Sequence, residues 1–275
     1  MTTDHNPQRE QMADASMLRT LSAQAEAIWP EEAPLFARYS LPSEPHIADI
    51  GCGSGEITKR FLAMYPSAHV VGVDILEEMV ERTRAVTASF GDRVRAIAAD
   101  AFQLPFGDGE FNLVVCRHMT QAVPHPEKLI AELVRISAPG GWLHLLSEDY
   151  GMLHFPDGAR DPDDLWAKGV RVLARATSTD DRIGRKTWAL LKKSGVEDLR
   201  VDYATVDTLR VPRATFAGII SAWRDGYAEA IASHSQISSP DVRALFDHAI
   251  ASILDPECYA VWHVPIVSGR IPKPR

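Results

Sequence analysis

Short apolar runs alternate with amphipathic stretches through the first part of the chain. The apolar runs have the length of buried strands and end in loop-forming residues. They predict strands at His46–Ile50, His69–Asp74, Val94–Ala99, Phe111–Cys116 and Gly141–Glu148. The stretches between them have helical spacing and predict helices at Glu56–Met64, Leu76–Ser89 and Glu127–Ser137. Because strands that alternate with helices form a parallel sheet with helices on both faces, we expect an α/β fold.

The pattern changes after Tyr150, where helical segments outnumber strands. Helical spacing predicts helices at Asp161–Ala176, Arg185–Lys193, Ala214–Ala232 and Pro240–Leu254. Residues that favour extended backbone predict strands at Leu199–Leu209 and Cys258–Val267. Two helices therefore separate the last two strands.

Two segments lie outside this order, the helical part near the N-terminus and the pair of helices before the last strand. Ligands of open parallel sheets bind beyond the carboxyl ends of the strands, and extra segments there usually form a cap. We expect a flexible tail at residues 1–15 and a single domain at residues 16–275. Residues 16–45 and 210–256 are expected to cap the substrate site.

Composition narrows the classes of partner. The chain has 275 residues and a formal net charge of -8, so it lacks the excess of basic residues that is typical of proteins that bind nucleic acid. No apolar run has the length of a membrane span, and the polar start of the chain lacks the apolar core of a signal peptide. Three widely spaced cysteines suit reduced thiols. We therefore expect a cytoplasmic protein that binds a small molecule, without nucleic acid or membrane and compatible with a homodimer.

A glycine-rich turn follows the first predicted strand. In the sequence ADIGCGSGEI, Gly51, Gly53 and Gly55 occupy alternate positions directly before a helix. Glycine has no Cβ and tolerates positive φ, so a ligand can lie against bare backbone. The free amides at the start of the helix point toward that ligand. The turn therefore predicts a site for a nucleotide-like cofactor.

The spacing of these glycines, preceded by Asp49, resembles motif I of the class I S-adenosylmethionine (SAM)-dependent methyltransferases. It differs from the G-x-G-x-x-G fingerprint of dinucleotide-binding domains. The resemblance extends to Asp74 at the end of the second strand, to the segment DAFQLPFGDGEF from Asp100, and to Pro-Gly-Gly before the fifth strand. It implies SAM as the cofactor and a Rossmann-like seven-strand sheet whose last strand inserts antiparallel next to the sixth.

Each cofactor assignment has a structural alternative. Asp74 can accept hydrogen bonds from a ribose diol, or it can cap the next helix. Asp100 can accept from an adenine amino group, or it can be a solvated loop residue. Arg38 can pair with the SAM carboxylate, or it can be a surface charge. The cofactor-binding residues expected from the resemblance are Arg38, Tyr39, Asp49, Gly51, Gly53, Gly55, Asp74, Ile75, Asp100, Ala101, Phe102, Cys116 and Arg117.

Polar residues after the fourth and fifth strands are the candidates for contact with the methyl acceptor. A methyl group on a sulfonium is already electrophilic, so alignment supplies much of the rate, and a base is needed only for an acceptor that must lose a proton. The candidate catalytic residues are His118, Glu148, Tyr150 and His154. The alternative roles are ordering of the loop for His118 and capping or ion pairing for Glu148. Because no compact metal-binding spacing is present, we expect no metal.

These observations predict an enzyme, a SAM-dependent methyltransferase that acts on an oxygen or nitrogen atom of a small, partly apolar metabolite. Aromatic residues in the expected cap, among them Trp166, Trp223 and Tyr227, suit such an acceptor, although helical spacing also fits ordinary core packing. The alternatives are methylation of carbon or sulfur, methylation of tRNA or protein, and SAM binding without transfer. A nicotinamide dehydrogenase is disfavoured by the glycine spacing.

Overall fold

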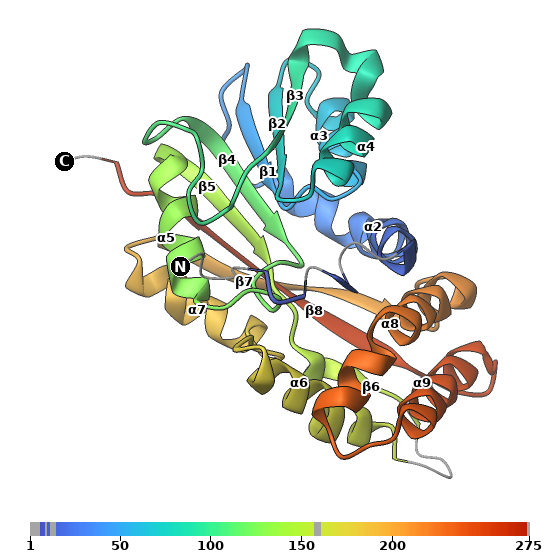
Figure 1. The fold of residues 1–275 in the computed structure, drawn as a ribbon. Helices are drawn as coiled ribbons and strands as arrows, with labels where there is room; N and C mark the ends of the chain where they lie inside the picture. Colours follow the sequence, from blue (N-terminus) through green and yellow to red (C-terminus); the bar gives the residue numbers. More distant parts are fainter. Residues whose placement is uncertain (1–5, 9, 12–14, 157–160, 274–275) are drawn as a thin grey trace.

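The computed structural model describes residues 6–8, 10–11, 15–156 and 161–273. Its centre is a sheet of parallel strands, shown in Figure 1. These are β1 (His46–Ile50), β2 (His69–Asp74), β3 (Val94–Ala98), β4 (Phe111–Arg117) and β5 (Ser137–Leu146), in the spatial order β3-β2-β1-β4-β5. The order reverses between β1 and β4, and a crevice at such a switch point is the usual ligand site of an open α/β sheet.

Helices cover both faces of this sheet. Residues of α2 (Ala15–Phe36) and α3 (Glu56–Met64) share one apolar cluster with β1 and β2, and α4 (Glu77–Thr87) packs beside α3. On the other face, α5 (Pro126–Ile136) and α7 (Gly184–Lys193) share a second cluster with the same strands. This arrangement confirms the α/β fold expected from the alternating pattern.

The last long strand, β8 (Val261–Arg270), lies antiparallel between β5 and β7 (Glu197–Asp207). This is the closing pair that the resemblance implies. Leu153–His154 adds a two-residue strand, β6, that also pairs with β8 and that the sequence did not predict. β5 begins at Ser137, earlier than expected, because the chain becomes extended as soon as α5 ends.

A third apolar cluster lies beyond the carboxyl ends of the strands. It contains residues of α8 (Arg213–His234) and α9 (Ser239–Leu254), with Trp166 and Trp262 among its largest side chains. Short helical segments join this region to the sheet: η2 (Tyr150–Met152), the π-helical η3 (Leu165–Val170) and α6 (Arg171–Ala176). Another short helix, η1 (Ala88–Arg93), leads from α4 into β3. The helix α2 packs against α8, so both segments expected to form a cap lie together.

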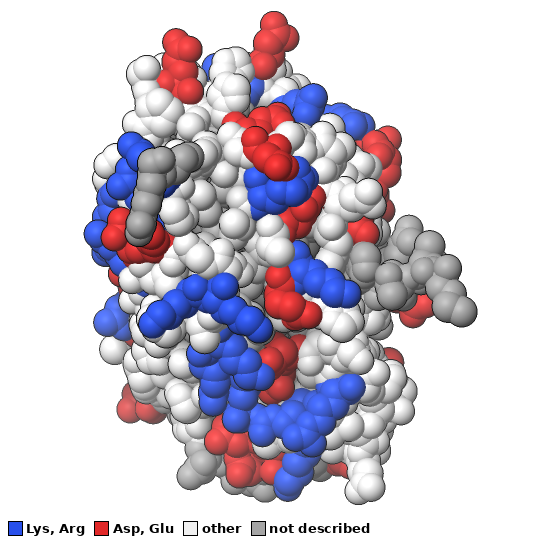
Figure 2. All heavy atoms as spheres, turned by 90° about the vertical axis from the view of Figure 1, so that its left-hand side faces the viewer, with Lys and Arg blue, Asp and Glu red and all other residues white. Residues whose placement is uncertain are grey.

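Charged side chains of both signs share the face shown in Figure 2. Lys and Arg gather in a band across it, with Asp and Glu between them. On α5, Arg135 pairs with Glu132 at 2.7 Å, and on α7, Lys186 pairs with Asp180 at 2.5 Å. Within the described residues, no helix is both long and apolar enough to cross a membrane.

Candidate functional site

The glycine turn between β1 and α3 depends on backbone that glycine adopts most readily. The φ angles of Gly51, Gly53 and Gly55 are +77°, +52° and +81°. The amides of Gly51 and Cys52 both donate to the Val73 carbonyl oxygen, at 2.8 and 2.9 Å, which ties the turn to the end of β2. A Cβ on Gly55 would lie 2.8 Å from the Thr83 Cα, so α3 and α4 pack too closely for a side chain there.

Asp74 is fixed at the end of β2 by two backbone amides. Its Oδ2 accepts from Gly53 N and its Oδ1 from Leu76 N, both at 3.0 Å. Burial raises the pKa of this carboxyl, and the two amide hydrogen bonds oppose that rise. The Asp74 side chain thus orders the turn before α4, and the two amides fix the orientation of its carboxylate at the glycine turn. Because Leu76 is the N-cap residue of α4 and no side chain caps that helix, the capping alternative for Asp74 is wrong, and its ribose assignment stays a prediction.

One pocket extends from the glycine turn to the apolar cluster of the cap. At the turn it is lined by Asp74 and, from the loop after β3, by Asp100, whose Oδ1 accepts from the Phe102 amide at 2.9 Å. The sequence-predicted residues that line this pocket are Gly51, Gly53, Asp74, Ile75, Asp100, Ala101, Phe102, Arg117, His118, Glu148 and Tyr150. The topology therefore brings the ends of β1, β2, β3, β4 and β5 together around one cavity.

Three predicted cofactor residues do not line the pocket. Asp49 is buried and accepts a 2.6 Å hydrogen bond from the Thr58 hydroxyl, and burial raises its pKa to about 6. Gly55 is the N-cap residue of α3. Cys116 is fully buried in the apolar cluster on the α5 face.

The structure does not bring Arg38, Tyr39 or His154 to the pocket, which corrects three expectations. Arg38 lies on the surface and donates two 2.8 Å hydrogen bonds to Asp202 of β7. The Tyr39 ring is buried against Trp142, at 4.8 Å between ring centroids. His154 is exposed on β6. These side chains have partners or solvent elsewhere, so we no longer assign them to the cofactor or to catalysis.

Arg117, at the end of β4, is held by a buried ion pair with Glu32 of α2. Arg117 Nη2 lies 2.8 Å from Glu32 Oε2, and Nε donates to Glu32 Oε1 at 2.9 Å. Glu32 Oε1 also lies 3.0 Å from Nε2 of His144, whose Nδ1 lies 2.7 Å from the Tyr39 hydroxyl. Burial alone would raise the Glu32 pKa, but Arg117 and His144 outweigh it and lower the pKa to about 2.

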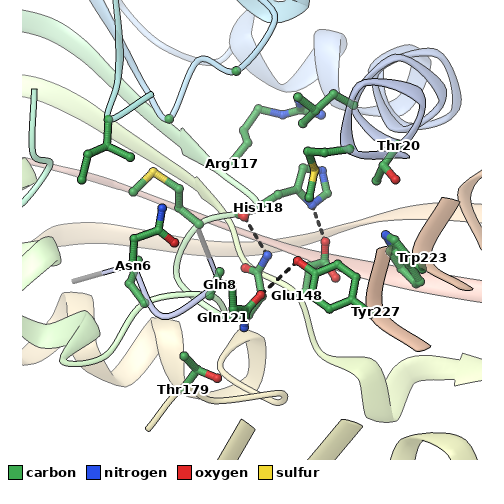
Figure 3. A pocket seen from close by; sticks show the side chains of 18 of the residues that line it. Asn6, Gln8, Thr20, Arg117, His118, Gln121, Glu148, Thr179, Trp223 and Tyr227 are labelled. Atoms are coloured by element: carbon green, nitrogen blue, oxygen red, sulfur yellow. Dashed lines mark hydrogen bonds and ion pairs between the residues drawn. The ribbon is translucent and has the colours of Figure 1, made fainter. Parts of the chain in front are cut away.

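His118 and Glu148 form a second buried pair, which Figure 3 shows inside the pocket. His118 Nδ1 lies 2.6 Å from Glu148 Oε1. Because a carboxylate only accepts hydrogen bonds, Nδ1 carries a proton, and in the neutral imidazole Nε2 keeps its lone pair. The φ angle of His118 is +53°, unusual for a residue other than glycine. The pair has the arrangement of a general base oriented by a carboxylate.

Aromatic side chains surround the end of the pocket at the cap. Tyr150 stacks on Trp166 at 5.6 Å between ring centroids, and Trp223 meets Tyr150 edge-on at 5.5 Å. Tyr227 donates from its hydroxyl to Gln8 Oε1 at 3.0 Å, so the N-terminal segment reaches the same cavity. Burial, followed by the charge of Glu148, raises the Tyr150 pKa well above its usual value.

Some pocket residues were not predicted from the sequence. They include Thr20 and Gln24 from α2, Met119 and Gln121 after β4, and Gln8. The amide of Gln121 donates to the His118 carbonyl oxygen at 2.7 Å. Helical spacing marked α2 as a cap but did not say which of its faces meets the pocket. Among the residues the structure describes, no group of three or more His, Cys, Asp or Glu side chains could hold a metal ion.

Comparison with known proteins gives a family match for the part of the chain that holds the glycine turn. Residues 47–141 match the model of a family described as "Methyltransferase domain". Demethylmenaquinone methyltransferase of Thermus thermophilus is 34% identical over 128 residues, 46% of this chain and 57% of the relative. The 27-O-demethylrifamycin SV methyltransferase of Amycolatopsis mediterranei is 33% identical over 156 residues, 56% of each chain.

The chain spans less than two thirds of the length of these curated relatives. Among solved structures, the [4+2]-cyclase SpnF aligns with a TM-score of 0.61 over 98% of each chain, at 16% identity. A likeness at this identity concerns the fold alone. The glycine turn thus lies within residues 47–141, the part of the chain that is similar to the methyltransferase-domain family, and the fold around it is shared with SpnF.

Proposed function

We propose that this protein transfers the methyl group of SAM to an oxygen or nitrogen atom of a small, partly apolar acceptor. One observation carries the proposal: a single pocket joins the glycine turn and Asp74 to the His118–Glu148 pair and the aromatic end of the cavity. The names of two curated relatives support a small-molecule acceptor, since they describe methylation of demethylmenaquinone and of a 27-O-demethylrifamycin, and the second name indicates oxygen as the acceptor atom.

The residues at the glycine turn fit SAM. The Asp74 carboxylate is already oriented by two amides, which leaves lone pairs for the two hydroxyls of a ribose. Asp100 and Ala101 line the same pocket, and we assign them to the edge of the adenine. Gly51 and Gly53 present backbone without a Cβ to the methionine part of the molecule.

The chemistry divides between the cofactor and this chain. SAM, when bound, supplies a methyl group that is electrophilic because its sulfur is a sulfonium. His118 Nε2 accepts the proton of an acceptor hydroxyl, and Glu148 holds the ring and stabilises the imidazolium that results. The aromatic side chains exclude water and align the acceptor, which lowers the entropic part of the barrier.

A small molecule fits the protein surface better than nucleic acid does. The chain carries a net charge of -8, and the cations of the face in Figure 2 are interspersed with carboxylates. Such a surface lacks the single-sign field that phosphate backbones require. The free thiols of Cys52, Cys116 and Cys258 agree with the cytoplasmic location expected from the sequence.

The experiment is a transfer reaction with SAM that carries an isotopically labelled methyl group. The purified protein is incubated with a panel of small hydroxyl and amine acceptors, and products are identified by mass spectrometry and NMR. We expect a labelled methyl group on an oxygen or nitrogen atom. A labelled methyl group on carbon or sulfur would show that the protein methylates one of these atoms instead, which is the alternative considered above. SAM binding with no labelled product from any acceptor pool would contradict the proposal.

A further inference from the structure

The pocket contains three buried hydrogen-bond acceptors that have no donor within the described part of the chain. They are His118 Nε2, Glu148 Oε2 and Gln121 Oε1. All three residues line the pocket, and the side chains of His118 and Glu148 are only 9% and 2% exposed. Buried polar atoms are nearly always hydrogen-bonded, so three acceptors in one cavity call for donors from a ligand or from water.

Each atom is assigned as an acceptor from its partners. Glu148 Oε1 receives the His118 Nδ1 proton, and in the neutral imidazole, the form that can act as a base, Nε2 then keeps a bare lone pair. Gln121 Nε2 donates to the His118 carbonyl oxygen, and because that oxygen only accepts, the amide orientation is fixed with Oε1 free. Gln24 Nε2, at 3.5 Å, also approaches Glu148 through Oε1 and does not serve Oε2.

Two tyrosine hydroxyls lie near Glu148. Burial, followed by the charge of Glu148, raises the pKa values of Tyr150 and Tyr227, and a hydrogen bond with Glu148 adds to the rise for Tyr150. Among the described residues, Glu148 Oε2 has no hydrogen-bond partner. The Tyr227 hydroxyl proton is directed to Gln8 Oε1 instead. Glu148 thus keeps one carboxylate oxygen bare, and a donor to a charged oxygen is worth more than a donor to a neutral one.

Most of the remaining side chains at this end of the pocket are apolar or aromatic, with Thr179 and Asp181 as polar members and Trp166 Nε1 as a buried donor without a partner among the described residues. Tyr150, Trp166, Trp223 and Phe246 come from four different elements and line the same cavity. Figure 3 shows Trp223 and Tyr227 beside the His118–Glu148 pair, with Gln121 near them. A ligand that fits must therefore combine a flat apolar body with donors gathered at one edge.

From this arrangement we infer that the acceptor is an aromatic compound with hydrogen-bond donors on two neighbouring ring positions, one facing His118 Nε2 and the other Glu148 Oε2. The inference rests on the proposed function and names its substrate class. It makes Glu148 a specificity-determining residue as well as the partner of His118. The donor that faces His118 is the hydroxyl that loses its proton.

The test measures binding of three matched probes to the protein saturated with S-adenosylhomocysteine. The probes are a vicinal naphthalenediol, its monomethyl ether and its dimethyl ether, and tryptophan fluorescence reports binding. Each donor removed leaves a buried acceptor unpaired, so we expect the diol to bind roughly tenfold or more tightly than the monoether, with the diether weaker still.

Glu148→Gln provides the sharpest variant. The His118 Nδ1 proton retains the amide oxygen as its acceptor, so the amide nitrogen takes the place of Oε2 and presents a donor to the pocket. We expect the preference for the diol over the monoether to disappear or reverse. Glu127→Gln, the same change at an exposed site on α5, is the control and should keep the wild-type preference.

The possible outcomes separate this inference from the proposed function. Failure of the wild-type protein to bind S-adenosylhomocysteine would contradict the proposed function. If S-adenosylhomocysteine binds but the three probes bind equally, or none binds, water satisfies the three acceptors and the inference is wrong. If the Glu148→Gln variant still prefers the diol, Glu148 does not accept a hydrogen bond from the ligand, and its role as a specificity-determining residue is wrong. If that variant does not fold, the order of the three probes on the wild-type protein still decides.

Discussion

At the residue scale, His118 has a backbone conformation that its residue type rarely adopts. A residue other than glycine in the left-handed region costs of order 1–3 kcal/mol and persists only where its surroundings hold it. Here the Gln121 amide holds the carbonyl oxygen and Glu148 holds the ring. The strained turn directs the ring into the pocket at the end of β4, where a proton acceptor is useful.

His118→Asn tests this role, because asparagine tolerates positive φ while it removes the imidazole. We expect turnover to fall roughly a hundred-fold to ten-thousand-fold, as for loss of a general base, with S-adenosylhomocysteine binding retained. His125→Asn is the matched control, since His125 has a φ of +56° and lies exposed at the start of α5. Equal losses of binding and turnover would instead make His118 a cofactor contact.

The sequence predicted those pocket residues that directly follow strands. The carboxyl ends of parallel strands lie along one edge of the sheet, so residues that follow these strands line one pocket: Asp74, Asp100, His118 and Glu148. Gln121 and Gln24 gave no signal, since a glutamine in a loop or on an amphipathic helix is ordinary. Arg38 was assigned by resemblance, and only the fold shows that Asp202 of β7 lies beside it.

At the element scale, α2 is joined to the sheet by charge as well as by apolar packing. Glu32 of α2 is fully buried, and its carboxylate contacts the Arg117 guanidinium of β4 and the His144 ring of β5. A buried ion pair adds little to the stability of the folded protein when it is compared with an apolar pair of the same size. Removal of one partner is strongly destabilising, however, because it leaves the other charge buried without compensation. Arg117 precedes His118, so this connection also fixes the strand end that carries the proposed base.

Glu32→Gln should therefore destabilise the protein by about 3–5 kcal/mol at neutral pH. The folded-state pKa of Glu32, about 2, lies below the usual value of 4.5, so its stabilisation is present above pH 4.5 and lost as pH falls toward 2. The difference in unfolding free energy between wild type and variant should shrink in that range. Urea unfolding at neutral pH and near pH 3 measures it, with exposed Glu44→Gln as the control. A difference independent of pH would contradict the buried ion pair.

The boundaries of most elements could be predicted because the alternation of apolar and amphipathic stretches is strong in this chain. The strand β6 could not, since two residues carry no periodicity and Leu153 and His154 become a strand only by pairing with β8. The position of β8 between β5 and β7 came from the resemblance, because pattern alone does not order strands in a sheet.

At the scale of the whole molecule, the pocket lies between the sheet and the segments expected to form a cap. Residues from α2, α8 and α9 line it together with the ends of the strands. We propose that residues 16–45 and 210–256 act as that cap within a single domain. The likeness to a [4+2]-cyclase over 98% of each chain shows that this fold serves more than one reaction, so the reaction depends on the site.

Hydrogen exchange followed by mass spectrometry tests the cap. When S-adenosylhomocysteine and the naphthalenediol bind together, amide exchange should slow in α2 and α8 as well as in the glycine turn, because bound molecules tie these elements to one another. The exposed N-terminal part of β7 serves as an internal reference that should not change. Protection confined to the glycine turn would contradict a role for these helices as a cap.

Calorimetric titration with S-adenosylhomocysteine measures directly whether the glycine turn and Asp74 form the SAM site. We predict one binding site with micromolar affinity in the wild-type protein. Asp74→Ala should weaken it roughly tenfold to a hundredfold, as expected for lost hydrogen bonds to a charged group. Asp92→Ala, an exposed position on η1, should bind like wild type. Absence of binding to the wild-type protein, or unchanged affinity in Asp74→Ala, would contradict the account.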